Sequence, residues 1–158
     1  MNAAFDVHEV RDDGDLGHVR QLILEHAAAR ATTPGVEFMR ADATALPGRY
    51  AAPKGGIWMA RAADVGIGCV ALRPLDATSA EVKRMYVQPE WRGRGVGRKL
   101  LRALLAGARE RGYRTLRLGT LDDMFAAHAL YRSIGFTPIE RYRPDELIDT
   151  RFYELSLT

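Results

Sequence analysis

The sequence predicts a single α/β domain in which about four helices flank a mixed central β-sheet of about six to seven strands. Two patterns predict this fold class. Segments such as Phe5–Val10 alternate apolar and polar residues as strands do, whereas Gly97–Arg111 repeats its leucines at helical spacing. The segments also follow one another in the order β-α-α-β-β-β-α-β-α-β-β, which is typical of an α/β chain built on a mixed sheet.

Capping and turn residues set the expected boundaries of the elements. Asp12–Asp15 supplies N-cap candidates for a first helix that runs to about Arg30, and Thr33-Pro34-Gly35 ends that helix. Leu46–Gly56 is rich in proline and glycine, which predicts a loop. The remaining predicted elements, in chain order, are a helix at Val36–Ala43, strands at Ile57–Arg61, Gly66–Leu72 and Ala80–Val87, a helix at Gly97–Arg111, a strand at Thr115–Thr120, a helix at Met124–Ile134, and strands at Phe136–Glu140 and Phe152–Leu157.

Length and composition are those of one globular domain spanning residues 1–158. Hydrophobic residues make up 47% and charged residues 27%, close to globular averages, so disorder is not expected. The first residues lack the apolar run of a signal peptide, and no stretch is long and apolar enough to cross a membrane. The lone Cys69 and four scattered histidines offer neither a disulfide nor metal-ligand spacing. We therefore expect a cytoplasmic protein without a metal site.

The charge balance argues against one class of partner. The formal net charge is only +3, although the isoelectric point is about 9.2. This is a weak indication of an anionic ligand, and it is too small to predict a nucleic-acid-binding protein.

The segment Gln88–Leu101 holds the sharpest signal in the sequence. Gly93, Gly95 and Gly97 remove side chains where the backbone turns between a strand and a long helix. The first amide groups of a helix have no intrahelical partners and its dipole favours negative charge, so this turn predicts an anion site. Arg92, Arg94 and Arg98 add positive charge that can meet a pyrophosphate.

Two common nucleotide motifs do not fit this turn. The dinucleotide fingerprint G-x-G-x-x-G would need a third glycine where Arg98 stands, and the P-loop sequence GK followed by Ser or Thr is absent. The pattern that remains is R-x-x-G-x-G, formed by Arg92, Gly95 and Gly97.

That pattern resembles the coenzyme A pyrophosphate loop of the GCN5-related N-acetyltransferases (GNAT superfamily). The resemblance extends to AEVKRMYV before the loop and to TLRLGTL and MFAAHALYRSIGF after it, and it covers roughly Ala80–Ile139. It implies a GNAT-like fold and acetyl-CoA as cosubstrate. The residues that it assigns to the cofactor are Met85, Tyr86, Val87, Arg92, Gly93, Arg94, Gly95, Val96, Gly97 and Arg98.

The resemblance also suggests two catalytic residues. Acetyl transfer needs a base for the amine and an acid for the thiolate that leaves. Glu81, on the predicted strand Ala80–Val87, is the candidate base acting through water; the alternative is an ordinary ion pair with Lys83 or Arg84. Alternation predicts that Glu81 shares a strand face with Lys83, Met85 and Val87.

Tyr131, in the pattern LY-x-x-x-GF, is the candidate acid; the alternative is a core aromatic residue. The sequence departs from the family at Gly119-Thr120, where related chains often carry Asp-Thr, and at Met124, where many carry Asn.

Other chemically interesting residues have simpler interpretations. Cys69 is expected to be a buried, inert thiol, and His128 is expected to have a packing or surface role. His18 and His26 are expected to be solvated. Weak candidates for the acceptor pocket are Phe38, Tyr50, Glu37 and Asp42, with Lys54 and Arg49 in the neighbouring loop; Glu37 or Asp42 would attract a cationic amine.

Three hypotheses of function follow. The first is an N-acetyltransferase that moves the acetyl group of acetyl-CoA onto a primary amine, of a small molecule or a peptide, by direct attack. The second is a coenzyme A-binding regulatory module with little catalysis, and the third, disfavoured by charge, is a nucleic-acid-binding domain. No membrane partner is expected, and the resemblance suggests a homodimer formed through the C-terminal strands.

Overall fold

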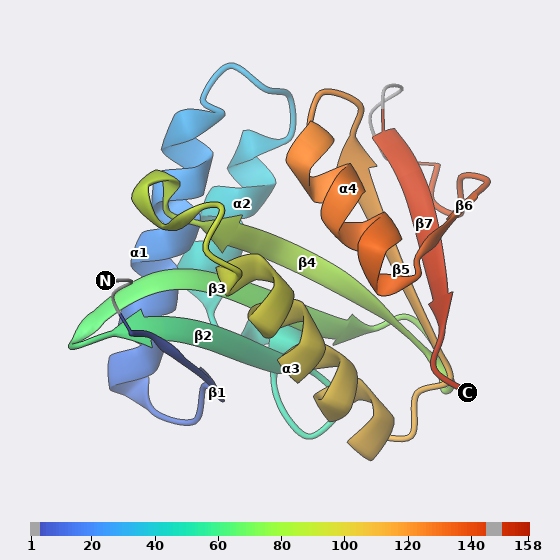
Figure 1. The fold of residues 1–158 in the computed structure, drawn as a ribbon, viewed down its shortest axis with the longest axis horizontal. Coiled ribbons are helices and arrows are strands. Elements are labelled where there is room, and N and C mark those ends of the chain that lie inside the picture. Colours follow the sequence, from blue (N-terminus) through green and yellow to red (C-terminus); the bar gives the residue numbers. More distant parts are fainter. Residues whose placement is uncertain (1–3, 145–149) are drawn as a thin grey trace.

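The seven strands in the described part of the chain belong to one mixed sheet with the order β1-β2-β3-β4-β5-β7-β6 (Figure 1). The computed structural model describes residues 4–144 and 150–158; residues 1–3, in the segment searched for a signal peptide, lie outside it. Strands β4 and β5 are parallel, and every other neighbouring pair is antiparallel. The strands are β1 (Asp6–Glu9), β2 (Gly56–Ala62), β3 (Val65–Pro74), β4 (Ser79–Val87), β5 (Thr115–Leu121), β6 (Thr137–Ile139) and β7 (Thr150–Ser156).

In the described residues four α-helices cover the sheet, as the sequence predicts, and they lie two on each face. They are α1 (Asp13–Ala29), α2 (Val36–Ala45), α3 (Val96–Glu110) and α4 (Phe125–Ile134), joined by short 3₁₀ turns η1 (Gly48–Tyr50) and η2 (Pro89–Trp91). Figure 1 shows α3 in front of the sheet and α1 and α2 behind it. The predicted fold class is confirmed, and element boundaries shift by at most two residues.

Alternating strand residues build the two cores. Trp58 and Ala60 of β2 pack with the leucines of α3, whereas Ile57 and Met59 pack with α1 and α2. This is the period-two alternation of a strand that is buried on both faces. Asp12 caps α1 by accepting a 2.8 Å hydrogen bond from the Asp15 amide, so one of the predicted N-cap candidates is the cap.

The predicted alternation fails in β4. Ala80 and Val82 pack in the core under α3, and so do Met85 and Val87, whereas Tyr86 packs on the opposite face. Glu81 and Lys83 therefore do not share a face with Met85 and Val87. The cause is a β-bulge between the pairs Ala71–Lys83 and Cys69–Tyr86, where β4 has one extra residue and Arg84 adopts a φ of 58°.

Strands β4 and β5 separate soon after they meet. They pair only at Ser79–Thr115, Ala80–Leu116 and Glu81–Arg117, although each strand continues beyond these pairs. Figure 1 shows the strands close together near the C-terminus and diverging toward α2 and α4. Beyond Glu81, the side of β4 that faces β5 has no strand partner, and this opening positions the site described below.

The packing of α3 on the sheet gives a test of the fold. A methyl group at Gly107 would lie 2.2 Å from Cζ2 of the buried Trp58, so we expect Gly107→Ala to lower the free energy of unfolding by about 1–3 kcal/mol. At Gly17 in α1 nothing lies within 4 Å of a methyl group placed in the same way. Gly17→Ala is therefore expected to raise the free energy of unfolding by about 0.5–1 kcal/mol. Urea unfolding of both variants checks this, and equal effects would contradict the packing described.

Candidate active site

A pocket of about 670 Å³ lies where β4 and β5 separate. Its walls come from the end of α1, the α1–α2 connection, α2, β4, β5 and α4. A cavity of this size is within the range that binds small molecules. Phe38 of α2, which is 76% exposed, is part of the lining and gives the pocket an apolar border.

Tyr131 contributes a polar group to the pocket from α4. The residue is only 6% exposed, and its ring packs edge-on against Phe136. Its hydroxyl has no hydrogen-bond partner among residues 4–144 and 150–158. Burial raises the pKa of Tyr131 above its ordinary value, so the phenol keeps its proton at neutral pH.

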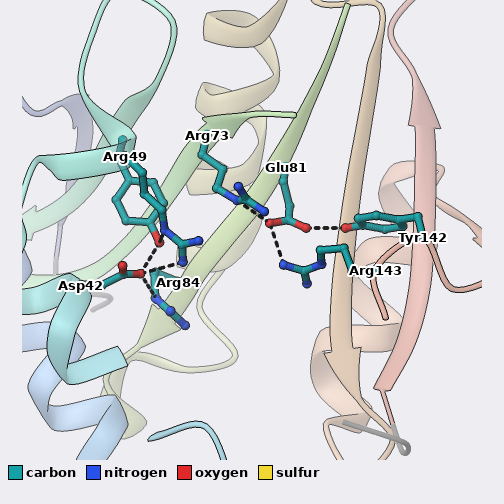
Figure 2. A network of polar contacts seen from close by, with 8 residues as sticks. Asp42, Arg49, Arg73, Glu81, Arg84, Tyr142 and Arg143 are labelled. Carbon is teal, nitrogen blue, oxygen red and sulfur yellow. Dashed lines mark hydrogen bonds and ion pairs between the residues drawn. The ribbon is translucent and has the colours of Figure 1, made fainter. Parts of the chain in front are cut away.

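Glu81 lies at the point where β4 and β5 part, and its side chain is fully buried (Figure 2). Oε1 accepts a 2.8 Å hydrogen bond from Arg73 Nε and a 3.2 Å hydrogen bond from Arg143 Nη1, and Oε2 accepts one of 2.5 Å from the Tyr142 hydroxyl. Burial acts to raise the pKa of Glu81, but Lys83, Tyr142 and the two arginines outweigh it and hold the pKa below its ordinary value. Glu81 is therefore ionised at neutral pH.

The glycine-rich turn presents a run of unpaired backbone donors. The amides of Gly93–Arg98 donate to no acceptor in the described part of the chain, and the Lys99 amide is the first that bonds back, to Gly95. Gly93 and Gly95 have φ values of 76° and 84°, a conformation that only glycine adopts easily. Six consecutive free amides at a helix start are suited to bind an anion, and we call this turn the anion site.

Arginine side chains surround that turn, and the turn lies beside α4. Arg92 Nε donates to the Val87 carbonyl at 2.9 Å, Arg94 lies over the Trp91 ring, and Arg98 donates to Ser133 of α4. A methyl group at Gly97 would lie 3.2 Å from Leu130, the residue before Tyr131. The anion site and the Tyr131 helix are therefore in direct contact.

Comparisons with known proteins identify this arrangement. The family model for the acetyltransferase (GNAT) family matches residues 22–136, well over half of the chain. The chain belongs to the GNAT family. An uncharacterized N-acetyltransferase of Schizosaccharomyces pombe is 32% identical over 120 residues, 74% of each chain. The enzyme class implied by the resemblance, an acetyl-CoA-dependent N-acetyltransferase, is thereby confirmed.

Two solved structures of bacterial acetyltransferases share the fold. A GNAT acetyltransferase of Staphylococcus aureus superposes with a TM-score of 0.84 at 24% identity, covering 98% of this chain and all of the other. An acetyltransferase of Salmonella typhimurium, solved with its cofactor acetyl-CoA, has a TM-score of 0.70 at 24% identity over 99% of this chain and 95% of its own. At this identity the likeness concerns the fold.

The structure explains one of the two departures from the usual GNAT sequence. A side-chain carbon at Gly119 would lie 3.1 Å from Phe152 and from Thr150, and 3.4 Å from Arg143. A carboxylate at that position would crowd Phe152 and Thr150 and would lie beside Arg143, which in this chain donates to Glu81. Met124 lines the pocket directly before α4, and nothing in the structure accounts for its replacing the usual amide.

Several residues judged from the sequence have clear structural roles. Cys69 is buried, and burial raises its pKa to about 12, as expected for an inert thiol. Both ring nitrogens of His128 are engaged, one by the Tyr153 hydroxyl at 2.8 Å and one by the Leu121 carbonyl at 2.9 Å, so the packing role is confirmed.

The expectation that His26 is solvated is wrong. His26 lines the pocket and stacks on Tyr86 at 4.9 Å between ring centroids. Burial, followed by the charges of Arg84, Arg30 and Arg92, lowers its pKa to about 4, so the ring is neutral at neutral pH. Period-based reasoning missed it because helix α1 turns its C-terminal end toward the pocket.

The acidic residues predicted to attract a cationic amine are occupied. Glu37 is exposed and paired with Arg40. Asp42 lines the pocket, but its Oδ2 accepts from Arg84 Nε at 2.7 Å, from Arg49 Nη2 at 2.9 Å and from the Tyr50 hydroxyl (Figure 2). Tyr50 is buried, and neither Tyr50 nor Lys54 lines the pocket.

Sequence reasoning missed four arginines of the pocket. Arg30, Arg73, Arg84 and Arg143 all line it, and no sequence motif marks them. In the described residues, no helix is long and apolar enough to cross a membrane, and no three potential ligands gather as a metal site would need.

The neutral state of His26 predicts a pH dependence of stability. Since its pKa is about 4 in the folded protein and 6.5 in the unfolded chain, the unfolded state binds more protons between these values. Stability is therefore lost as the pH falls through this window, by about 2 kcal/mol between about pH 7 and about pH 5. Urea unfolding of His26→Gln is expected to lack this loss, while His18→Gln, which keeps His26, retains it. A pH dependence in His26→Gln equal to that of the wild type would contradict the account.

Proposed function

We propose that this GNAT enzyme transfers the acetyl group of acetyl-CoA directly to a primary amine, with Tyr131 as the acid and Glu81 as the base acting through water. The observation that supports the proposal best is the opening between β4 and β5. Among the described residues, it combines an unpaired strand edge, a buried tyrosine hydroxyl without a hydrogen-bond partner, and a turn with free amides in contact with the tyrosine helix.

Two parts of the opening suit the two parts of the cofactor. The free amides of Gly93–Arg98, which include Val96 and Gly97, together with Arg92, Arg94 and Arg98, suit a pyrophosphate. The free edge of β4 at Met85–Val87 suits the amide groups of pantetheine, and it offers backbone donors to the thioester oxygen. The acetyl-CoA found in the Salmonella typhimurium structure supports this assignment.

The reaction balances with these residues alone. The neutral amine nitrogen attacks the thioester carbon, a C–N bond forms and the C–S bond breaks. Tyr131 donates its proton to the leaving thiolate, and the proton of the amine passes through water to Glu81. The raised pKa of Tyr131 keeps it protonated until the thiolate forms.

Glu81 needs help to act as a base. Its lowered pKa makes it a weak proton acceptor. While Glu81 takes up the proton, each of its three hydrogen-bond donors must either stay in place or be replaced by water. The arginines around the pocket supply part of that help. Positive charge near a bound amine lowers its pKa, as it does for His26, and thereby favours the neutral nucleophile.

Two further aspects stay predictions. The acceptor is a small-molecule or peptide amine, and the enzyme acts in the cytoplasm. A homodimer formed through the C-terminal strands is proposed on the family resemblance alone.

The anion site is tested by titration with acetyl-CoA. We expect an Arg92→Ala, Arg94→Ala double variant to bind acetyl-CoA at least about tenfold more weakly, because charge-assisted hydrogen bonds to phosphate are lost. An Arg11→Ala, Arg40→Ala double variant removes equal charge from exposed ion pairs and is expected to bind as the wild type does. Isothermal titration calorimetry measures all three proteins. Absence of binding to the wild type would overturn the proposed function.

The chemical roles are tested by steady-state kinetics. Tyr131→Phe and Glu81→Gln are each expected to lower kcat by about a hundredfold or more, while the affinity for acetyl-CoA is retained. A base role further predicts that Glu81→Gln recovers activity as the pH rises toward the pKa of the amine. A loss that is independent of pH, together with a lower melting temperature, would instead make Glu81 a structural anchor. If the wild type binds acetyl-CoA and acetylates no amine, the regulatory module is favoured.

A further inference from the structure

The pocket is strongly cationic. In the described part of its lining, six side chains are arginine or lysine and Asp42 alone is acidic. The nearby Glu81 lies behind this lining, fully buried under its arginine partners. A polycationic acceptor would meet repulsion here, whereas an acceptor that carries a negative charge would be attracted.

Arg84 is the most specifically arranged of these cations. The bulge in β4 holds its backbone at a φ of 58°, a conformation that is strained for a residue with a side chain and that is concentrated at functional sites. Its side chain is only 12% exposed. The Nε atom donates to Asp42, and the two Nη nitrogens have no hydrogen-bond partner among the residues that the structure describes (Figure 2).

Asp42 fixes Arg84 without neutralising the cluster. The carboxylate also binds Arg49 and the Tyr50 hydroxyl, so two guanidinium groups share one negative charge. Burial acts to raise the pKa of Asp42, but these hydrogen bonds and charges lower it overall, so the carboxylate stays ionised and keeps Arg84 in place. The guanidinium group of Arg84 is therefore held in place, and its two Nη nitrogens remain available to a ligand.

Arg73 repeats the same arrangement on β3. Its Nε atom donates to Glu81 at 2.8 Å, and its Nη nitrogens have no hydrogen-bond partner within residues 4–144 and 150–158. Both arginines line the same pocket. A guanidinium edge of this kind matches the two oxygens of a carboxylate in a planar, bidentate pair.

We propose that the amine acceptor also carries a carboxylate, as an amino acid does, and that Arg84 binds this carboxylate through its Nη edge with Arg73 beside it. The inference rests on the proposed acetyl transfer and names its substrate class. It makes Arg84 a residue that determines acceptor specificity. Burial lowers the pKa of His26 most, and the charges of Arg84, Arg30 and Arg92 lower it further, so His26 lies in the same positive surroundings that the carboxylate would meet.

The test compares each standard L-amino acid with its α-carboxamide, and adds spermidine as a polycation. The carboxamide carries the less basic amine, so its intrinsic reactivity works against the predicted preference. We expect the wild type to acetylate its best amino acid at least about tenfold better in kcat/KM than the matching carboxamide. In Arg84→Gln this ratio is expected to fall to about threefold or less, through a higher KM for the acid.

Two further variants separate recognition from charge and folding. Arg40→Gln removes one positive charge from the exposed part of α2, outside the pocket, and is expected to keep the wild-type ratio. Arg84→Lys keeps the positive charge but lacks the planar guanidinium group, so it is expected to recover only part of the acid-to-carboxamide ratio. This variant carries the test if Arg84→Gln does not fold. Acetyl-CoA affinity, measured for every variant, reports on the folded site.

The outcomes distinguish this inference from the proposed function. A wild type that prefers carboxamides or spermidine, or an Arg84→Gln variant that keeps the preference, would overturn the inference while acetyl transfer stands. If no amine is acetylated, the proposed function fails, and titration of CoA-loaded protein with the acids and carboxamides decides the inference separately. Acids binding and carboxamides not binding supports it, and any other pattern overturns it.

Discussion

The early separation of β4 from β5 is the constraint on which the rest of the site depends. The two strands pair at only three positions, and then β4 bends away through the bulge at Arg84. A continuous sheet would bury these backbone groups and close the pocket. Because the strands part, a strand edge, the Tyr131 hydroxyl and the inner ends of α1 and α2 all face one cavity.

The electrostatics of the cavity follow from how its carboxylates are used. Asp42 and Glu81 each accept a hydrogen bond from the Nε atom of an arginine, and these pairs neutralise most of the negative charge of the two carboxylates. The pocket therefore presents guanidinium edges to a ligand. Burial and the same positive charge keep His26 neutral. In the proposed reaction this charge would both attract the acceptor carboxylate and favour the neutral amine.

The sequence predicted those features that local rules control. The fold class, the two faces of α3 and the glycine turn depend on periodicity, on caps and on positive φ values at glycine, and each is visible in the sequence. The bulge at Arg84 left no such signal, because a positive φ is expected at glycine and here it occurs at an arginine. The alternation assigned to β4 failed for this reason, and with it the arginine that lines the pocket was missed. Arg73 lies opposite Glu81 on the neighbouring strand β3. The other two partners of Glu81, Tyr142 and Arg143, are 61 and 62 positions away in the sequence and could not be inferred from strand spacing.

The most direct test of this account is amide hydrogen exchange of the wild-type protein with and without acetyl-CoA. The free amides of Gly93–Arg98 and the β4 edge at Met85–Val87 are predicted to become strongly protected together, while the buried strands β2 and β3 change little. Protection at both segments would show that the opening between β4 and β5 holds the cofactor. Saturating acetyl-CoA with no added protection at either segment would contradict the central claim.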